Sequence, residues 1–281
     1  MALRITTLVE NNQGENKALK NEHGLCFYIE KDDHRILFDT GQSRALLHNA
    51  AQLRIDLELL DFVVLSHGHY DHTGGLIPLM EMTTEFELVT GPGLHDEKYA
   101  FANQTYEFLG NNFDEKFIRG KGIKHHCVNE QVLEQQVTEI CPEVFILSGF
   151  PRIHDDETIN PRFKVRCQGQ FRDDKFEDEI MMAIDTPMGL VAILGCSHPG
   201  MKNMLDMAHN LLKKPIHAVL GGTHLVEADD ISLDLSMAYL EKKSIDVIGF
   251  SHCTGEVATK RLAKSNRQYS QNCTGTSLFI N

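Results

Sequence analysis

The sequence predicts an α/β protein in which helices cover the faces of β-sheets. Two observations support this class: each half of the chain contains a strand-like hairpin, and strands then alternate with helices. The composition agrees, since 42% hydrophobic and 24% charged residues are values of an ordinary globular protein. A chain of 281 residues can also bury a sizeable core without disulfides or a structural metal.

The first half contains the elements of one such unit. Strands are expected at 4–9, 25–30, 35–39 and 61–66. A polar turn at 31–34 joins two of them into a hairpin, and a helix is expected at 43–52 with Ser43 as its N-cap. The continuous apolar run Phe-Val-Val-Leu within 61–66 predicts a strand buried on both faces, and it leads directly into a histidine-rich loop.

The second half repeats this order. The expected strands lie at 180–185, 190–194, 216–220, 246–250 and 277–280, and the expected helices at 203–213, 232–242 and 256–264. Three of these strands run straight into a loop that contains His198, His224 or His252. Ligand sites in such folds lie at the carboxyl ends of strands, so we expect the functional site where these loops meet.

Residues 94–175 separate the two halves and have a different character. The stretch is polar, weakly periodic and rich in aromatic residues between Tyr99 and Phe117. We interpret it as an insertion or lid over the sheet edge, within a single domain of residues 1–281. Its aromatic rings are expected either to pack against one another or to stack on a flat substrate ring. Four basic residues are expected either to form a solvated face or to hold a substrate phosphate: Lys116, Arg119, Lys121 and Lys124.

Charge and composition argue against several classes of function. Lys and Arg number 27 and Asp and Glu number 40, so the net charge is −13. This balance argues against a general nucleic-acid binder and against docking on an anionic membrane. Seven cysteines without a CxxC pair fit reduced thiols, so a cytoplasmic location is expected. The sequence contains neither a Walker loop nor a GxSxG elbow, so neither an NTPase nor a serine hydrolase is indicated.

The strongest motif follows the strand expected at 61–66 and predicts metal binding. It reads His67-Gly68-His69-Tyr70-Asp71-His72. Imidazoles at positions i and i+2 of an extended loop can point to one metal ion, and the Asp and His that follow can reach a second. Nitrogen ligands with a carboxylate suit Zn²⁺, and also Fe or Mn. One loop cannot complete two coordination spheres, so further ligands are expected from His198, His224 and His252.

With these loops, and with Asp39 in Ile36-Leu37-Phe38-Asp39-Thr40-Gly41, the chain resembles the metallo-β-lactamase superfamily. That fold is a four-layer αββα sandwich built from two similar halves. The resemblance implies two divalent metal ions, with Zn favoured and Mn or Fe as alternatives. It also implies that Asp39 supports the metal loop. The implied ligands are His67, His69 and His198 for the first ion, and Asp71, His72 and His252 for the second.

Four further motifs are similar to the dihydropterin–ribofuranosylaminobenzene-phosphate synthase subfamily. They are Glu22-His23-Gly24-Leu25, Gly195-Cys196-Ser197-His198-Pro199-Gly200, Gly222-Thr223-His224-Leu225 and His252-Cys253-Thr254-Gly255. This resemblance implies a small-molecule substrate that contains pterin and phosphate, and it leaves a homo-oligomer open. The chain departs from the superfamily at 221–224, because the bridging Asp usual there is missing. His224 is expected to ligate in its place or to contact phosphate.

The ligand set supports more than one reaction. A metal pair can lower the pKa of bound water for hydrolysis, with Asp71 as ligand and proton acceptor, or it can neutralise a diphosphate leaving group during transfer. A pterin transferase is the leading hypothesis, and a hydrolase of a small ester, lactone or phosphodiester is the alternative. An iron redox protein and a non-catalytic metal sensor also stay open. Cys196 and Cys253 are expected to pack beside the ligands or to bind metal, and Asp178 and Glu179 to be ordinary edge charges.

Overall fold

Two large β-sheets form the centre of the protein. The computed structural model describes residues 3–128 and 136–280. Within them the first sheet has seven strands, in the spatial order β17 (Ser277–Ile280), β1 (Leu3–Val9), β2 (Cys26–Lys31), β3 (His34–Phe38), β4 (Phe62–Leu65), β5 (Glu87–Thr90) and β8 (Lys124–Cys127). The second, within the same residues, has six, in the order β16 (Val247–Phe250), β15 (Ile216–Gly221), β14 (Gly189–Leu194), β13 (Ile180–Thr186), β10 (Val144–Ser148) and β9 (Val137–Cys141).

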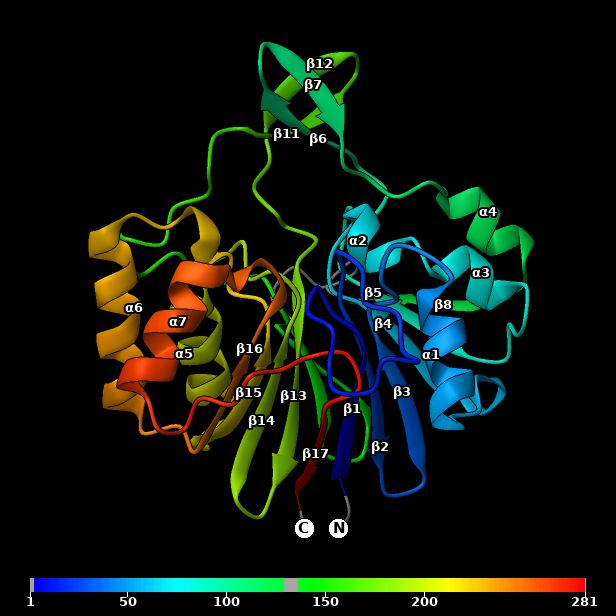
Figure 1. Ribbon diagram of the computed structural model, residues 1–281. Coiled ribbons are helices and arrows are strands. Elements are labelled where there is room, and N and C mark those ends of the chain that lie inside the picture. The colour runs from blue at the N-terminus through cyan, green and yellow to red at the C-terminus, as the bar shows by residue number, and fades with distance from the viewer. Residues whose placement is uncertain (1–2, 129–135, 281) are drawn as a thin grey trace.

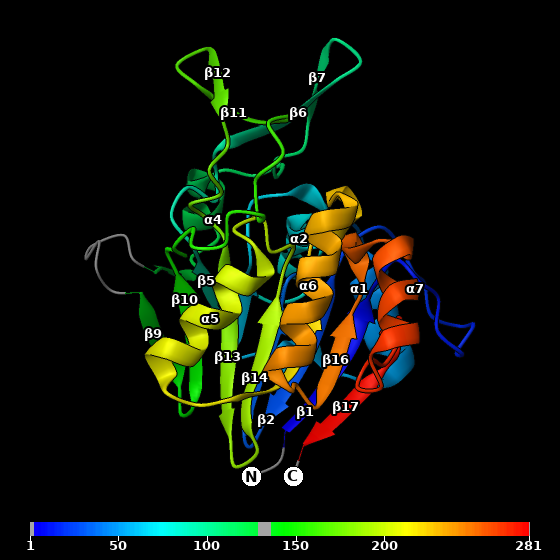
Figure 2. The same cartoon turned by 90° about the vertical axis from the view of Figure 1, so that its left-hand side faces the viewer.

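Helices cover the outer face of each large sheet, so the layers run helix, sheet, sheet, helix (Figures 1 and 2). On the side of the first sheet lie α1 (Ala45–Leu53), α2 (Tyr70–Thr73), α3 (Leu76–Met80) and α4 (Glu115–Gly120). On the side of the second lie α5 (Met201–Leu212), α6 (Asp230–Lys243) and α7 (Glu256–Ser265). Short 3-10 turns occur at Leu57–Leu59, Leu225–Glu227 and His252–Thr254. None of the described helices is long and apolar enough to cross a membrane.

The alternation of side chains along the strands produces three hydrophobic layers. In β2, Phe27 and Ile29 face the second sheet, and Cys26 and Tyr28 face the helices. In β14, the side chains at 191 and 193 join the layer between the sheets, and those at 190, 192 and 194 pack toward α5 and α6. Both faces of each central strand are therefore buried, which explains the continuous apolar runs in the sequence.

The directions of the strands place their following loops at one edge. Strands β3, β4, β5 and β8 run parallel to one another, as do β14, β15 and β16. The carboxyl ends of β3, β4, β14, β15 and β16 lead into the loops that carry the predicted ligands. The sequence-predicted αββα class is therefore confirmed, and its site-bearing loops meet above the sandwich.

The predicted elements of the two halves agree with the structure to within one or two residues. One cap differs. The N-cap of α1 is Arg44, and the hydroxyl of Ser43 accepts a hydrogen bond from the backbone N–H of Ala45 at 3.1 Å. Strands β1 and β17 pair antiparallel, so the first and last described strands lie side by side.

The stretch 94–175, expected as one insertion, is divided among three sheets. Strand β8 extends the first large sheet, and β9 and β10 extend the second. A small sheet is formed by β12 (Gln170–Asp173), β11 (Phe163–Cys167), β6 (Glu97–Ala102) and β7 (Thr105–Phe108), and it projects above the sandwich (Figure 1). Of the aromatic rings between Tyr99 and Phe117, those on β6 and β7 pack largely on one another there, as Tyr99 does on Phe108 and Tyr106 on Phe101. Residues 129–135 of the expected insertion lie outside the described residues.

Candidate metal centre

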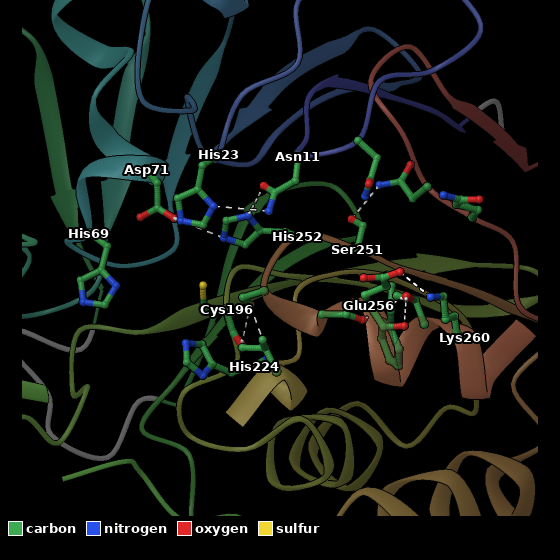
Figure 3. Close-up of a pocket in the computed structure, with 18 of the residues that line it drawn as sticks. Asn11, His23, His69, Asp71, Cys196, His224, Ser251, His252, Glu256 and Lys260 are labelled. Atoms are coloured by element: carbon green, nitrogen blue, oxygen red, sulfur yellow. Dashed lines mark hydrogen bonds and ion pairs between the residues drawn. The ribbon is translucent and has the colours of Figure 1, made fainter. Parts of the chain in front are cut away.

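The structure brings together the residues of five loops that are distant in the sequence. Strand β3 leads into Asp39, β4 into 67–72, β14 into Cys196 and His198, β15 into His224, and β16 into His252. The expected ligands are all buried, with no more than 7% of each residue exposed: His67, His69, Asp71, His72, His198 and His252. Figure 3 shows His69, Asp71, His252 and His224 around the sulfur of Cys196.

One set of donors consists of His67, His69 and His198. Their ring centroids lie 4.6 to 5.2 Å apart. Each Nε2 atom is buried and finds no hydrogen-bond partner among the residues that the structure describes. Burial lowers the pKa of all three imidazoles well below the usual value, so each ring is neutral and keeps a lone pair. Because an unpaired buried nitrogen is costly, these three adjoining rings fit the ligands of a divalent metal ion.

Asp39 connects two of the expected ligands. Its Oδ2 atom accepts a hydrogen bond from the hydroxyl of Ser66 at 2.8 Å and lies 2.6 Å from Nδ1 of His72. The Ser66 oxygen in turn lies 2.9 Å from Nδ1 of His67. Since the serine proton is used by Asp39, His67 donates from Nδ1, and its Nε2 lone pair is left to face the metal position.

A second set of donors surrounds Asp71. Its Oδ2 atom lies 3.1 Å from Nε2 of His23, 3.3 Å from Nε2 of His252 and 3.7 Å from Nε2 of His72. Burial opposes ionisation of this carboxyl, but the neighbouring imidazoles outweigh it and hold the pKa of Asp71 well below its usual value. Burial likewise opposes the charge of His72, yet Asp39 and Asp71 raise the pKa of that ring to about 9. Asp71 is therefore an anionic donor among imidazoles.

His23 was not predicted as a site residue, although its motif was noted. Its ring stacks on that of His252 with centroids 5.1 Å apart, and about half of its side chain is exposed. Asn11 contacts the other ring nitrogen of His252: Oδ1 of Asn11 lies 3.0 Å from Nδ1 of His252. The same oxygen accepts a hydrogen bond from the backbone N–H of Gly24. That oxygen acts as an acceptor, so His252 donates from Nδ1 and points Nε2 toward Asp71.

His224 lies next to the first set of donors. Its ring centroid is 4.4 Å from that of His198, and its Nδ1 atom pairs with Glu227 at 3.4 Å. Burial lowers the pKa of His224, but the Glu227 carboxylate outweighs this effect and raises it. The residue has a left-handed backbone, with φ of 51°, and its N–H donates to the sulfur of Cys253.

Asp178 and Glu179, expected as edge charges, are buried and hold the ligand loops. Asp178 accepts from the backbone N–H of Gly68 at 2.8 Å, and Glu179 accepts from the backbone N–H groups of Ser197 and His198. Lys98 is also buried, and it pairs with Asp174 at 2.7 Å and with Asp178 at 2.9 Å. The expectation for Asp178 and Glu179 was wrong, because the partners of both carboxylates come from loops distant in the sequence.

A cavity of about 740 Å³ opens beside these donors. His23, His69, Asp71, His224 and His252 line it, and both halves of the chain contribute to its wall. The basic residues that line it are Arg162 and Lys260.

The four basic residues, expected either to form a solvated face or to hold a phosphate, are not among those that line this cavity. Arg119 pairs with Glu115 and Lys124 with Glu87, and Lys121 lies over the ring of Phe117. Lys116 belongs to the same short helix α4, on the outer side of the first sheet (Figure 1). Arg119 lines a different cavity of about 480 Å³. The run therefore lies away from this cavity, and its contact with a substrate phosphate stays a prediction.

The aromatic rings next to the donors are Phe163 and Phe176, which the sequence did not single out. Phe176 stacks on His198, and Phe163 meets the rings of His198 and His224 at 5.0 and 5.6 Å. Phe163 begins β11, so the small sheet is in contact with the site through this ring.

The fold and the donor set define a class of protein. A sequence model of the metallo-beta-lactamase superfamily matches residues 20–128. A crystal structure described as a metal-dependent hydrolase of the beta-lactamase superfamily superimposes with a TM-score of 0.84 and 28% identity, covering 99% of each chain. The chain belongs to the metallo-β-lactamase superfamily.

Two relatives from Methanocaldococcus jannaschii are similar over nearly the whole chain. The 7,8-dihydropterin-6-methyl-4-(β-D-ribofuranosyl)-aminobenzene-5'-phosphate synthase is 32% identical over 266 residues, which are 90% of this chain and 88% of that protein. A second, uncharacterized protein is 30% identical over 262 residues, covering 90% of this chain and 93% of its own length. The subfamily resemblance found in the motifs is thereby confirmed.

Proposed function

We propose that the protein is a metal-dependent transferase that joins a dihydropterin methyl diphosphate to an aryl amine. The observation that carries the proposal is the trio of buried Nε2 atoms without described partners on His67, His69 and His198. The similarity to the synthase supports the substrate class. We propose two divalent ions, with Zn favoured and Mn or Fe as alternatives, and with Asp71, His72 and His252 as the second set of ligands.

In this reaction the amine nitrogen attacks the methylene carbon of the pterin. A C–N bond forms, the C–O bond to diphosphate breaks, and diphosphate leaves with the electron pair. When bound, the metal ions would supply positive charge for the leaving diphosphate. Asp71 borders the cavity as a carboxylate and is the residue we propose to accept the amine proton. His224, also at the cavity wall, is proposed to contact a phosphate group.

The cavity offers groups for the rest of such a substrate. Arg162 lies over the ring of Phe163 at 4.2 Å and pairs with Glu227. Lys260 also lines the cavity, on α7, where it pairs with Glu256 (Figure 3). Both can turn toward an added phosphate, and Phe163 offers a flat face for a ring. The cytoplasmic location expected from the cysteine pattern and the homo-oligomer stay predictions.

The test uses the full chain loaded with metal, a dihydropterin methyl diphosphate and ribofuranosylaminobenzene phosphate. We expect one diphosphate released for each C–N product detected by mass spectrometry, and loss of both after chelation. His67→Ala should abolish turnover, and His209→Ala, at an exposed site on α5, should not. No product from metal-loaded protein would contradict the proposal.

A hydrolase of a small ester, lactone or phosphodiester is the second candidate. It is favoured by the similarity to the structure described as a metal-dependent hydrolase. The same cavity and donors would serve it. Metal-dependent turnover of an ester, lactone or phosphodiester panel, without C–N product in the first assay, would establish this alternative in place of the transferase.

A further inference from the structure

We propose that Cys196 binds as a thiolate between the two metal positions and bridges them. The inference deepens the metal-dependent function proposed above and rests on it. It assigns to Cys196 the position that a carboxylate would otherwise take between two cations.

The geometry of the donor atoms points to this residue. The sulfur of Cys196 and the ring nitrogens of His67 and His198 all lie within 4.8 Å of one another. The same sulfur and the ring nitrogens of His72 and His252 form another such group. Cys196 therefore belongs to both sets of donors at once. Figure 3 shows its sulfur directed into the space between His69, Asp71 and His252.

The neighbouring donors give independent support for a metal ion at the sulfur. Nε2 of His67 and Nε2 of His198 are buried and have no partner among the described residues. On the other side, the sulfur lies 3.2 Å from Nε2 of His72. Cys196 itself is 3% exposed, so solvent does not satisfy these groups.

The backbone holds Cys196 in this place. It follows β14 and Gly195, where an added Cβ would collide with the side chain of Ser66. Only glycine allows β14 to approach the end of β4 this closely, and the approach brings the sulfur next to His67 and His72. Glu179 fixes the next two backbone N–H groups, so the loop from 196 to 198 is rigidly positioned.

The strand next to β14 offers no anionic donor at its end. Strand β15 ends at Gly221, and the following residues are Gly222 and Thr223. A Cβ at Gly222 would lie 2.6 Å from the sulfur of Cys253, so this position has no room for a carboxylate side chain. Cys196 is the anionic candidate at the centre of the two sets.

Two bound divalent cations would favour a thiolate at Cys196 over the neutral thiol. Once metal is bound, the proposed ligands would be five neutral imidazoles and one carboxylate, on Asp71, against two divalent cations. On metal binding the thiol would release its proton to solvent and form one bond to each ion, which adds a second negative charge. Thiolate suits Zn and Fe better than Mn, so the bridge also favours those two metals.

The test replaces the native metal by Co²⁺ in chelator-treated protein, because a thiolate bound to Co²⁺ gives a charge-transfer absorption in the near ultraviolet. We expect this band to grow over both the first and the second equivalent of Co²⁺. Cys196→Ala should remove the band and lower the affinity for the second Co²⁺ ion by more than about tenfold. Cys196→Ser, a smaller change, should also lack the band, and circular dichroism checks that each variant is folded.

Matched controls use the other buried thiols. Cys141→Ala, in the core between the sheets, and Cys253→Ala, beside Cys196, should both keep the band. Cys196→Asp should restore binding of the second equivalent of Co²⁺ but not the charge-transfer band, since a carboxylate can also bridge two ions. A band that grows over one equivalent only, or that survives in Cys196→Ala, overturns the bridge. Two bound ions without a band overturn the bridge but leave the metal-dependent function intact, whereas no bound ion contradicts both.

Discussion

The ring of Phe176 stacks on the imidazole of His198, with centroids 3.7 Å apart and planes inclined by 14°. The ammonium group of Lys98 also lies over the Phe176 ring, 4.6 Å from its centroid. One buried aromatic ring thus contacts both a proposed metal ligand and a buried cation. The stack fixes the plane of His198.

Replacing Phe176 by Ala should therefore weaken both the fold and metal binding. Loss of this buried ring should reduce the free energy of unfolding by about 3–5 kcal/mol. His198 would lose its stacking partner, so the affinity for metal should fall as well. Urea denaturation and metal titration check the two effects. Phe279→Ala is the control, because this residue is 64% exposed, and a change of less than about 0.5 kcal/mol is expected there. Equal losses in both variants would contradict the role of the stack.

Asp39→Asn should lower the affinity for metal while leaving every proposed ligand in place. The amide keeps the shape of the carboxyl but loses the charge that orients Nδ1 of His72 at 2.6 Å. We expect a loss of about 10–100-fold in metal affinity, measured by competition with a chelator. Asp33→Asn changes an exposed turn residue and should have no effect. An unchanged affinity in Asp39→Asn would mean that the contact does not support the ligand.

The stability of metal-free protein should depend on pH through Glu179. Burial raises the pKa of this carboxyl from 4.5 to about 8, although the N–H groups of Ser197 and His198 oppose the shift. A folded state with the higher pKa binds the proton more tightly than the unfolded chain. The contribution of Glu179 to the free energy of unfolding is therefore complete below pH 4.5 and declines as the pH rises to about 8.

Denaturation of chelator-treated protein between pH 5 and 8 checks this dependence. Glu179→Gln should remove most of the decline, whatever its effect on absolute stability, because glutamine does not titrate. Glu177→Gln, at the exposed neighbouring position, should keep the decline of the unchanged protein. A decline of the same size in Glu179→Gln would assign the pH dependence to other groups.

Lys98→Met should destabilise the protein strongly. The substitution preserves much of the side-chain volume but leaves the carboxylates of Asp174 and Asp178 buried without their cation. We expect a loss of about 3–5 kcal/mol in the free energy of unfolding, measured in urea. Lys214→Met breaks the pair with Asp185 at the surface, where the lysine is 46% exposed, and should cost less than about 1 kcal/mol. Similar losses in the two variants would contradict a buried ion-pair network.

The two halves of the sandwich could be predicted because their signals are local. The strands β4 and β14 are continuous apolar runs, and each ends in a loop whose histidines are visible in the sequence. The parallel arrangement of such strands brings these loops to one edge without any knowledge of longer-range contacts. The ligand candidates on 67–72, His198 and His252 could be named for the same reason.

The middle of the chain could not be predicted, because its pairing is non-local. Strand β8 reads Lys-His-His-Cys and lacks an apolar pattern, yet it pairs parallel with β5. Strand β11 pairs with β6, although β8, β9 and β10 lie between them in the sequence. Glu179 gave no signal either, because its burial depends on the backbone of a different loop.

The small sheet has a consequence for how the molecule can vary. Its strands pair only with one another among the described residues, and the turns of its two hairpins lie far above the sandwich (Figure 2). Residues at those turns, such as Asn103 and Gly169, can be lengthened, shortened or replaced without altering a hydrogen bond of either large sheet. The turns are thus natural points for insertion or for attaching a probe. We expect substitutions at Phe163, at the base of the sheet, not to be tolerated in the same way, because its ring contacts His198.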